Sequence, residues 1–442
     1  MRLLHLITIV LALTAGLSAD AKRLPEPGGE VRVQLFGSDL SLFEQAHVTL
    51  PLLERSRLGG LATWRSDVIA LELGEDTTSW LVRAKLQRTF VLRSIQQCLG
   101  STSSAWPARV LRAASISAEA RLSGDAIALT FSKPVGAAHE LLSGCWLQSS
   151  FALGGPFKQA GPTLLEANKD AMVPGPLLDR VQMVGDAEQA HIREGRGEAP
   201  GDGRVIAAAY PDVLLLVQRG EALKQDVLGV AADAEPGLAT FYRQFAAGTL
   251  VQVYSGGHGM ASRGVLPPGL AEPHPLPRVR AAARVEPLAL SAEDRYVRSV
   301  PVYVNQNDRV ARGFEDRLSL FLGSRSIGVS RVAQEAGARD GLSVVRWRPP
   351  SRDPGISMLE LMGRFPELRV GDGTLLLKLL SDSRAARLEA ALEVERAWID
   401  SRRVIPLATL DVWYEVTSGL EGVSVSDEGV PLLDDAFWGG SP

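Results

Sequence analysis

The sequence predicts an α/β fold with more than one lobe. Short apolar runs that are typical of buried strands alternate along the chain with segments whose apolar residues recur at helical spacing. Val213–Val217, five apolar residues in a row, is expected to be a central parallel strand. With 442 residues the chain exceeds what one hydrophobic core usually supports, so two or three lobes are expected.

The first residues indicate export. Arg2 precedes an apolar run, and Ala19-Asp20-Ala21 places small residues at the two positions that a signal peptidase inspects. We expect residues 1–21 to be a signal peptide that is cleaved after Ala21, leaving the mature protein in an oxidising space. Neither cysteine lies near this site, so a lipoprotein anchor is not expected. No later apolar run reaches the length of a membrane span.

Composition is that of an ordinary globular protein, with 45% hydrophobic and 22% charged residues. The formal net charge of −4 shows no dominance of either sign, so nucleic acid is not expected as a partner. The two cysteines, Cys98 and Cys145, are able to form one disulfide bond, but their number alone does not decide whether they pair.

Individual elements follow from periodicity and turn residues. Strands are expected at 30–36, 80–86, 127–131, 300–304 and 342–347, and two short strands within 151–183. Helices are expected at 89–99, 139–142, 240–247, 308–322 and 381–399. The last helix is expected to be capped by Ser381 or Asp382. Its expected apolar stripe is Ala385, Leu388, Ala391, Leu392, Trp398 and Ile399. Residues 188–204 are expected to form an exposed loop, and 266–278 an extended segment.

Catalytic and metal-binding motifs are incomplete. His139-Glu140 begins a zinc-protease pattern, but Ser143 stands where the second histidine is needed. Ser255 and His258 are joined by a flexible Gly-Gly link that fixes no hydrogen bond between them. The sequence contains no phosphate loop and no dinucleotide fingerprint, and its six histidines form no cluster. We therefore expect no catalytic residue, no metal site, no cofactor and no enzymatic activity.

The segment 341–362 is the strongest candidate for ligand contact. A buried strand ends at Trp347 and Arg348, and prolines then force an irregular loop that carries Asp353. In α/β proteins such loops commonly present side chains to a ligand, although a Pro-rich surface turn is the simpler interpretation of this segment alone.

At four places the sequence resembles the family 5 extracellular solute-binding proteins, the periplasmic peptide- and nickel-binding receptors of ABC importers. The resembling segments are Gly29–Phe36; Gly155-Pro156-Phe157 with Leu165–Asp170; Trp347–Leu359; and Val404–Leu407, Asp411–Tyr414, Gly422-Val423 and Phe437-Trp438. They are similar to the family's opening strand, its Gly-Pro-Tyr strand with the following turn, its Trp-x-x-Asp-Tyr-x-Asp-Pro segment and its closing strands.

The resemblance implies a periplasmic-binding-protein-like, two-lobed venus-flytrap with an additional, shortened subdomain. Lobe I is expected at 22–45, 150–225 and 403–442, the subdomain at 46–149, and lobe II at 226–402. It also implies a monomeric periplasmic receptor that captures a small-molecule or short-peptide ligand in the inter-lobe cleft and delivers it to an ABC transporter permease.

Departures from the family pattern bear on the ligand. Pro350 stands where the family's peptide receptors have the Asp that holds the peptide ammonium, and Ser351 stands where they have Tyr. Arg348 adds a positive charge that suits a carboxylate or phosphate, so acidic or uncharged ligands are expected. Asp353 matches the family's later Asp, which is expected to bond the backbone of the turn.

The candidate ligand-binding residues are Phe36, Trp146, Phe151, Tyr254, Trp347, Arg348 and Ser351. Aromatic side chains beside Gly or Ser often face ligands, but each of them is also a normal core residue. An alternative function is therefore kept open, that of an exported structural or interaction protein which retains the receptor fold but has lost solute binding.

Overall fold

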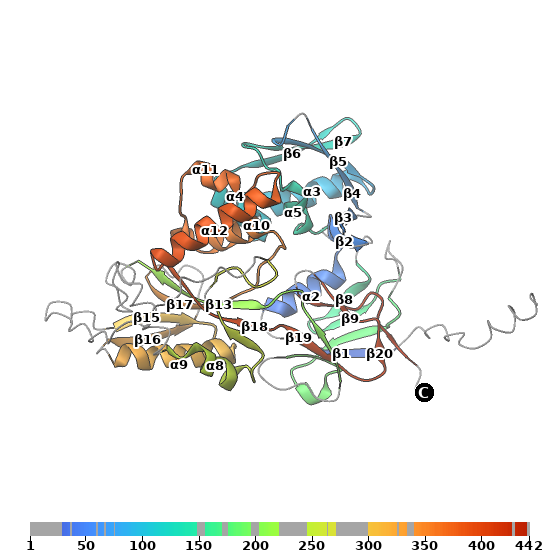
Figure 1. Cartoon of the computed structure of the whole chain (residues 1–442). Coiled ribbons are helices and arrows are strands. Elements are labelled where there is room, and N and C mark those ends of the chain that lie inside the picture. Colours follow the sequence, from blue (N-terminus) through green and yellow to red (C-terminus); the bar gives the residue numbers. More distant parts are fainter. Residues whose placement is uncertain are drawn as a thin grey trace, which may run out of the picture.

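The computed structural model describes residues 29–35, 38–58, 61–65, 68–74, 76–147, 155–169, 176–195, 203–220, 245–262, 264–270, 299–324, 327–333, 340–426 and 429–439. Two large sheets and one smaller sheet carry the architecture (Figure 1). The expected signal peptide at 1–21 lies outside the described residues. Within the described part, no helix is long and apolar enough to cross a membrane.

The first large sheet has seven strands in the order β12-β19-β11-β1-β10-β9-β8. β1 is parallel to both of its neighbours, and the other pairs are antiparallel. The strands are β1 (Glu30–Gln34), β8 (Phe157–Gly161), β9 (Leu164–Ala167), β10 (Arg180–Met183), β11 (Ile192–Glu194), β12 (Arg204–Ala207) and β19 (Trp413–Val416). Helix α2 (Ser38–Val48) packs on this sheet through buried Phe43. β11 lies in a region expected to be an exposed loop, because three residues are too few to show a period.

The second large sheet has six strands in the order β14-β18-β13-β17-β15-β16. They are β13 (Asp212–Arg219), β14 (Gly259–Ala261), β15 (Ser299–Val304), β16 (Gly328–Ala333), β17 (Gly341–Trp347) and β18 (Val404–Leu410). β13 is central, as expected, but it is antiparallel to both β17 and β18, so the expected parallel direction is wrong. An apolar run indicates that both faces of a strand are buried. The direction of the strand depends instead on how the chain enters the sheet.

Both faces of the second sheet are covered by helices (Figure 1). Leu214 and Leu216 of β13 face a core built with α8 (Ala247–Tyr254) and α9 (Arg309–Gly323). Val213, Leu215 and Val217 face the opposite core, which includes α10 (Pro354–Arg364), η3 (Pro366–Leu368), α11 (Gly373–Lys378) and α12 (Arg384–Asp400). This alternation explains the continuous apolar sequence of the strand.

The smaller sheet, in the order β4-β5-β7-β6, is antiparallel and forms a subdomain. Its elements are β4 (Ile69–Leu73), β5 (Ser79–Ala84), α3 (Arg88–Leu99), α4 (Trp106–Ala114), β6 (Ala118–Ser123), β7 (Ala126–Phe131) and α5 (Ala138–Ser143). Cys98 and Cys145 form a disulfide bond that joins the end of α3 to the turn after α5, which resolves the pairing that the sequence left open.

Short pairs complete the described elements. They are β2 (Glu54–Leu58) with β3 (Leu61–Arg65), β20 (Leu420–Glu421) with β23 (Phe437–Trp438), and β21 (Ser424–Val425) with β22 (Pro431–Leu432). A 3-10 turn, η1 (Ala187–Gln189), precedes β11.

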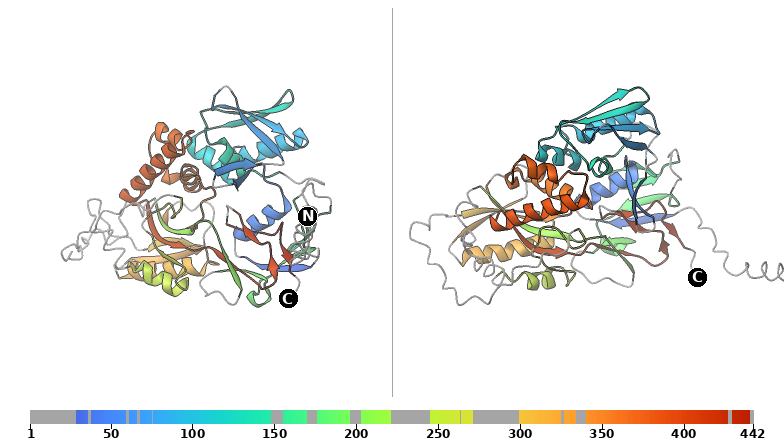
Figure 2. Two further views of the ribbon diagram at one scale, coloured as in Figure 1. Left: turned by 45° about the vertical axis from the view of Figure 1, so that its right-hand side comes forward. Right: turned by 45° about the horizontal axis from the view of Figure 1, so that its top comes forward.

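The subdomain and the α10–α12 layer share one continuous hydrophobic core. Helix α4 packs against α10 so closely that a Cβ on Gly363 would lie 2.6 Å from the Arg109 carbonyl oxygen. Figure 2 shows from two further directions that these two parts lie side by side. The second sheet, its helices and the subdomain therefore form one packed body.

The chain passes between the first sheet and this body at a few short segments. Residues 208–211 link β12 to β13, and residues 411–412 link β18 to β19. These two segments lie together, because the Ala208 amide donates to the Val412 carbonyl oxygen at 2.9 Å. Residues 50–52 follow α2 and lead into the subdomain, and residues 145–147 follow α5 and leave it. The two segments pair through Leu52 N to Cys145 O at 2.8 Å.

The expected lobe boundaries remain a proposal. β13 and β18 fall within the expected ranges of lobe I but pair within the second sheet, so we propose that both strands belong with lobe II. Each strand directly follows or precedes a crossing segment, and nothing in the local sequence shows on which side of the crossing a strand will pair. The division into two lobes and a subdomain otherwise stays our proposal.

Two expected helices differ from the observed ones. α8 begins at Ala247, and 240–244 of the expected helix lie outside the described residues. In α12 the N-cap is Ser383, whose hydroxyl accepts from the Ala386 amide at 3.4 Å, in place of Ser381 or Asp382. Its buried face is Arg387, Ala390, Ala391, Val394, Glu395 and Trp398. The prediction that Ala385 belongs to the buried stripe is wrong, since Ala385 is exposed. Two charged residues, Arg387 and Glu395, take part in the buried face instead.

The segment expected to be extended, 266–278, is described only as far as Leu270, where it forms a turn. Within 151–183 the structure has three strands, β8, β9 and β10, where two were expected. The other expected strands and helices are confirmed within one or two residues at each end wherever they are described.

Candidate functional site

The loop after β17 is held by internal contacts, beginning with Trp347. This side chain is fully buried, and its indole N–H donates to Glu360 Oε2 at 2.9 Å. Glu360 Oε1 also accepts from Arg109 at 2.7 Å and from Arg364 at 2.9 Å. Burial raises the pKa of Glu360, but the guanidinium groups of Arg364 and Arg109 outweigh burial and leave the pKa below its ordinary value. Trp347 is thus placed in the core.

Arg348 is neutralised within the protein. Its Nε lies 2.7 Å from Asp212 Oδ1, and its NH1 donates to the Gly429 carbonyl oxygen at 3.3 Å. Arg346 contacts the other oxygen of Asp212 at 2.6 Å. Burial raises the pKa of Asp212, but Arg348 and Arg346 overcome this and lower it to about 2. A guanidinium already paired in this way is a poor anchor for an anionic ligand.

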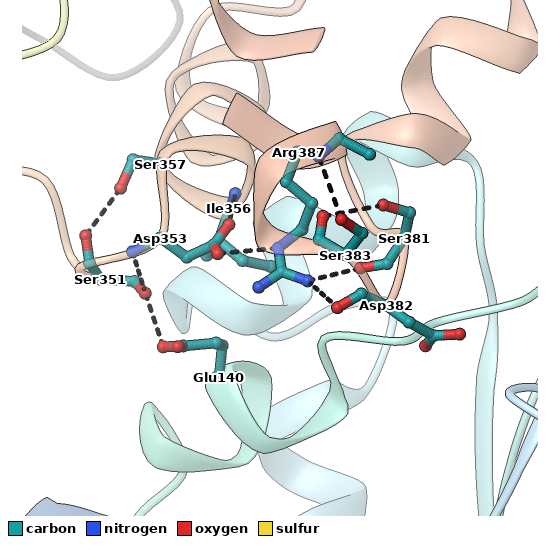
Figure 3. Close-up of polar contacts among 10 residues, drawn as sticks. Glu140, Ser351, Asp353, Ile356, Ser357, Ser381, Asp382, Ser383 and Arg387 are labelled. Carbon is teal, nitrogen blue, oxygen red and sulfur yellow. Dashed lines mark hydrogen bonds and ion pairs between the residues drawn. The ribbon is translucent and has the colours of Figure 1, made fainter. Parts of the chain in front are cut away.

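Ser351 and Asp353 tie the same loop to the subdomain and to α12 (Figure 3). The Ser351 hydroxyl donates to Glu140 Oε2 at 2.9 Å and accepts from the Asp353 amide at 3.1 Å. Asp353 caps α10 by accepting from the Ile356 amide at 3.1 Å, which confirms its expected role in the turn. Its second oxygen lies 2.7 Å from Nε of buried Arg387, whose NH1 donates to the carbonyl oxygens of Ser381 and Asp382.

The remaining candidate residues are separated in space. Tyr254 lies at the end of α8 against α9, where a Cβ on Gly313 would meet its ring at 2.5 Å. Phe36 and Phe151 lie outside the described residues. Trp146 is half-buried and lines a hollow between α2 and the subdomain. Among the described candidates, Trp146 and Tyr254 therefore lie apart from the loop that carries Trp347, Arg348 and Ser351.

The hollow that contains Trp146, which we call the junction groove, has a volume of about 650 Å³. This is within the range of small-molecule sites. It is lined by Leu42, Gln45 and Thr49 of α2 and the segment after it, by Ser94, Gln97 and Cys98 of α3, by Ser103, Ser104, Ala105, Trp106 and Arg109 at the start of α4, and by Gly144, Trp146 and Leu147.

The groove combines aromatic rings with neutral polar groups. Trp106 packs on Gly144, where an added Cβ would meet the indole at 2.1 Å, so glycine is required at this contact. The buried Trp106 Nε1 has no hydrogen-bond partner within the described part of the chain. Arg109, also in the wall, is bound to Glu360. The wall can therefore offer hydrogen bonds and aromatic surface without a free charge.

The groove lies between two parts of the fold. α2 packs on the first sheet, whereas α3 and α4 belong to the packed body of the subdomain and the second sheet. A molecule in the junction groove therefore touches both parts that the crossing segments connect. A hinge at those segments would change the width of the groove.

Most of the groove was not predictable from the sequence. Gln45, Gln97, Trp106 and Arg109 come from three segments whose proximity depends on how α2 docks beside the subdomain. The sequence around Trp106 does carry a recognisable pattern. Trp106 stands directly before Pro107 at the start of a helix and after a run of small polar residues. That pattern predicts a helix start and gives no indication of a ligand.

Among the described residues, no group of three or more His, Cys, Asp or Glu side chains could hold a metal ion. No protein-family model matches the chain, and no curated protein matches its sequence. Solved structures, in contrast, match over most of its length.

A dipeptide binding protein from Pseudoalteromonas sp. SM9913 in complex with Met-Leu superimposes with a TM-score of 0.68 at 12% identity, covering 93% of this chain and 100% of that one. The ABC transporter-associated periplasmic binding protein DppA from Helicobacter pylori, in complex with peptide STSA, gives 0.67 at 13% identity, covering 94% and 99%. NikA from Staphylococcus aureus, in complex with Ni(L-His)2, gives 0.66 at 10% identity, covering 93% and 100%.

These matches define the class of the fold. The chain has the two-lobed α/β architecture of the periplasmic solute-binding proteins, and the predicted resemblance to the peptide and nickel receptors is confirmed at the level of the fold. Since identity is between 10% and 13% in these comparisons, the ligand does not follow from them.

Proposed function

We propose that this protein is an exported solute-binding receptor of an ABC import system, which captures a small polar or peptide-like ligand between its two lobes. The observation that carries the proposal is the junction groove, which lies where α2, packed on the first sheet, meets the subdomain. The similar solved structures include receptors in complex with a dipeptide, a peptide and agropinic acid. Binding, without catalysis, is the activity that this architecture supports.

Residence in the periplasm, cleavage after Ala21, action as a monomer and delivery to a permease belong to the same proposal. They are supported by the apolar start of the sequence and by the class of the fold. The disulfide bond between Cys98 and Cys145 agrees with an oxidising compartment.

A thermal-shift screen of the mature protein tests the receptor function. Ligand classes to compare are short peptides, neutral sugars and organic acids, each up to millimolar concentration. A ligand present at about 100 times its dissociation constant adds about 2.7 kcal/mol to the free energy of unfolding, which gives a clear rise in Tm. A receptor should respond to at least one class, and a chain that responds to none is not a receptor for these solutes.

A second candidate function is favoured by the loop after β17. Trp347, Arg348 and Ser351, in the segment that resembles the peptide receptors' cleft, are all engaged in contacts within the protein. An exported interaction protein that keeps the receptor fold would show this feature. It would also give no thermal shift with any solute, and capture of a partner protein would replace solute binding as its measurable activity.

A further inference from the structure

We propose that the junction groove selects a neutral, polyhydroxylated solute of about the size of a di- or trisaccharide. This inference rests on the receptor function proposed above and names the class of its ligand. It follows from three properties of the groove, namely its compensated charge, its unused hydrogen-bonding groups and its aromatic surface.

The charge of the groove is compensated. Arg109 is the one ionisable side chain among the described residues that line it. Its Nε and NH2 donate to Glu360 Oε1 at 3.0 and 2.7 Å, and its NH1 donates to the Ser104 carbonyl oxygen. A charged ligand group would lose its water here without gaining a counter-ion, which opposes its binding. Peptides with free termini and dicarboxylates are therefore disfavoured.

The groove has neutral hydrogen-bonding capacity to spare. The side-chain amides of Gln45 and Gln97 are exposed, and they have no hydrogen-bond partner within the described part of the chain. Each amide offers both donors and an acceptor, which matches a hydroxyl group that donates and accepts at once. Trp106 Nε1 is itself buried against Gly144, so it is not one of these exposed groups.

Two indoles provide the apolar part of the same surface. Trp106 lies at the start of α4, and Trp146 approaches from the segment after α5. A sugar ring carries hydroxyl groups around its edge and C–H groups on its faces, so it can stack on an indole while its edge reaches the amides. Small-molecule sites commonly combine aromatic walls with a few polar groups in this way.

A second hollow extends the junction groove along α3. It has a volume of about 440 Å³, shares Gln97 and Ser103 with the groove and adds Phe90. Arg93 also lines this second hollow, and because its side chain is exposed, water solvates its charge. Because Gln97 lines both hollows, an extended ligand that occupied both would contact this side chain.

Calorimetry on the full mature chain tests the ligand class. The probes are cellobiose and maltotriose as neutral saccharides, the dipeptide Ala-Ala as a zwitterion and succinate as a dianion. We expect at least one saccharide to bind with a dissociation constant at least tenfold lower than that of either charged probe. If a charged probe binds more tightly than both saccharides, the ligand class is wrong while the receptor function stands. If no probe binds and the wider screen is also negative, the receptor function fails as well.

Variants locate the binding in the groove. Gln97→Ala removes an exposed amide without disturbing the core, and Gln159→Ala, on exposed β8 of the first sheet, is its matched control. We expect Gln97→Ala and Trp146→Phe each to weaken saccharide binding at least tenfold, with the affinity of the control within twofold of wild type. The Tm of each unliganded variant verifies folding. Saccharide binding that is unchanged in both groove variants would place the site elsewhere and overturn the inference.

Discussion

Arg348 and Asp212 form a buried ion pair, with 2.7 Å between Nε and Oδ1, directly beside the segment 208–211 that crosses between the two sheets. The same guanidinium reaches the Gly429 carbonyl oxygen at 3.3 Å, and Tyr414 Oη donates to that oxygen as well. Arg348 thus joins the second sheet to the C-terminal segment that packs on the first sheet. Its place in the fold is that of a structural residue at a crossing.

This arrangement predicts an order of destabilisation. Removing Asp212 leaves two buried guanidinium groups without their shared carboxylate, which should cost about 3 to 5 kcal/mol. Removing Arg348 leaves Asp212 paired with Arg346, so its cost should be nearer 1 to 3 kcal/mol. Urea unfolding of Asp212→Asn and Arg348→Met measures both values. Equal costs, or a larger cost for Arg348→Met, would show that Arg346 does not share the carboxylate.

His47 should make stability depend on pH. Its Nε2 accepts from the Leu433 amide at 3.1 Å, so Nδ1 carries the proton and donates to the Phe43 carbonyl oxygen at 2.7 Å. Burial outweighs the latter bond and lowers the pKa of His47 from 6.5 to about 4. The unfolded chain therefore binds a proton at higher pH than the folded protein, and stability is lost as the pH falls from 6.5 to 4.

The loss expected from this histidine is about 3 kcal/mol across that interval. His47→Gln keeps a hydrogen-bond donor and an acceptor but does not titrate. Between pH 7.5 and pH 4.0 the free energy of unfolding of this variant should therefore fall by about 3 kcal/mol less than that of wild type. Urea unfolding at pH 7.5 and pH 4.0 gives the comparison. Parallel pH profiles for the two proteins would mean that His47 is not buried in its neutral form.

The disulfide bond should contribute substantially to the subdomain. Cys98 and Cys145 are 47 residues apart, and the chain-entropy estimate for a loop of this length is about 4 kcal/mol. The variant Cys98→Ala/Cys145→Ala should lose about that much free energy of unfolding relative to the oxidised wild type. A loss below about 1 kcal/mol would indicate that the α3–α5 core constrains the loop without the covalent link.

Local patterns in the sequence were sufficient to predict the helices and strands and the class of fold. β17, α9 and the capping role of Asp353 depend on residues within a few positions of each other, so periodicity and turn chemistry identify them. The four short motifs that resemble the solute-binding proteins lie in the right order along the chain, and this order is what the fold confirms.

Partners that are distant in sequence explain what was missed. Arg348 suggests an anion anchor until Asp212, 136 residues away, is known to lie beside it. Arg387 and Glu395 occupy the buried face of α12 because Asp353 pairs with the first and the Leu266 amide donates to the second at 3.0 Å. The junction groove likewise depends on how α2 sits beside α3 and α4, which no local pattern encodes.

The most direct test of the account is the distance between the two lobes with and without solute. Spin labels at Gln159→Cys on β8 and Leu320→Cys on the exposed face of α9 report this distance by pulsed electron resonance, since both native cysteines are held in the disulfide bond. A hinged receptor predicts a narrower and shifted distance distribution with at least one solute class, with neutral saccharides as the expected class. A distribution that stays the same with every peptide, sugar and organic acid would contradict a receptor that closes on its ligand.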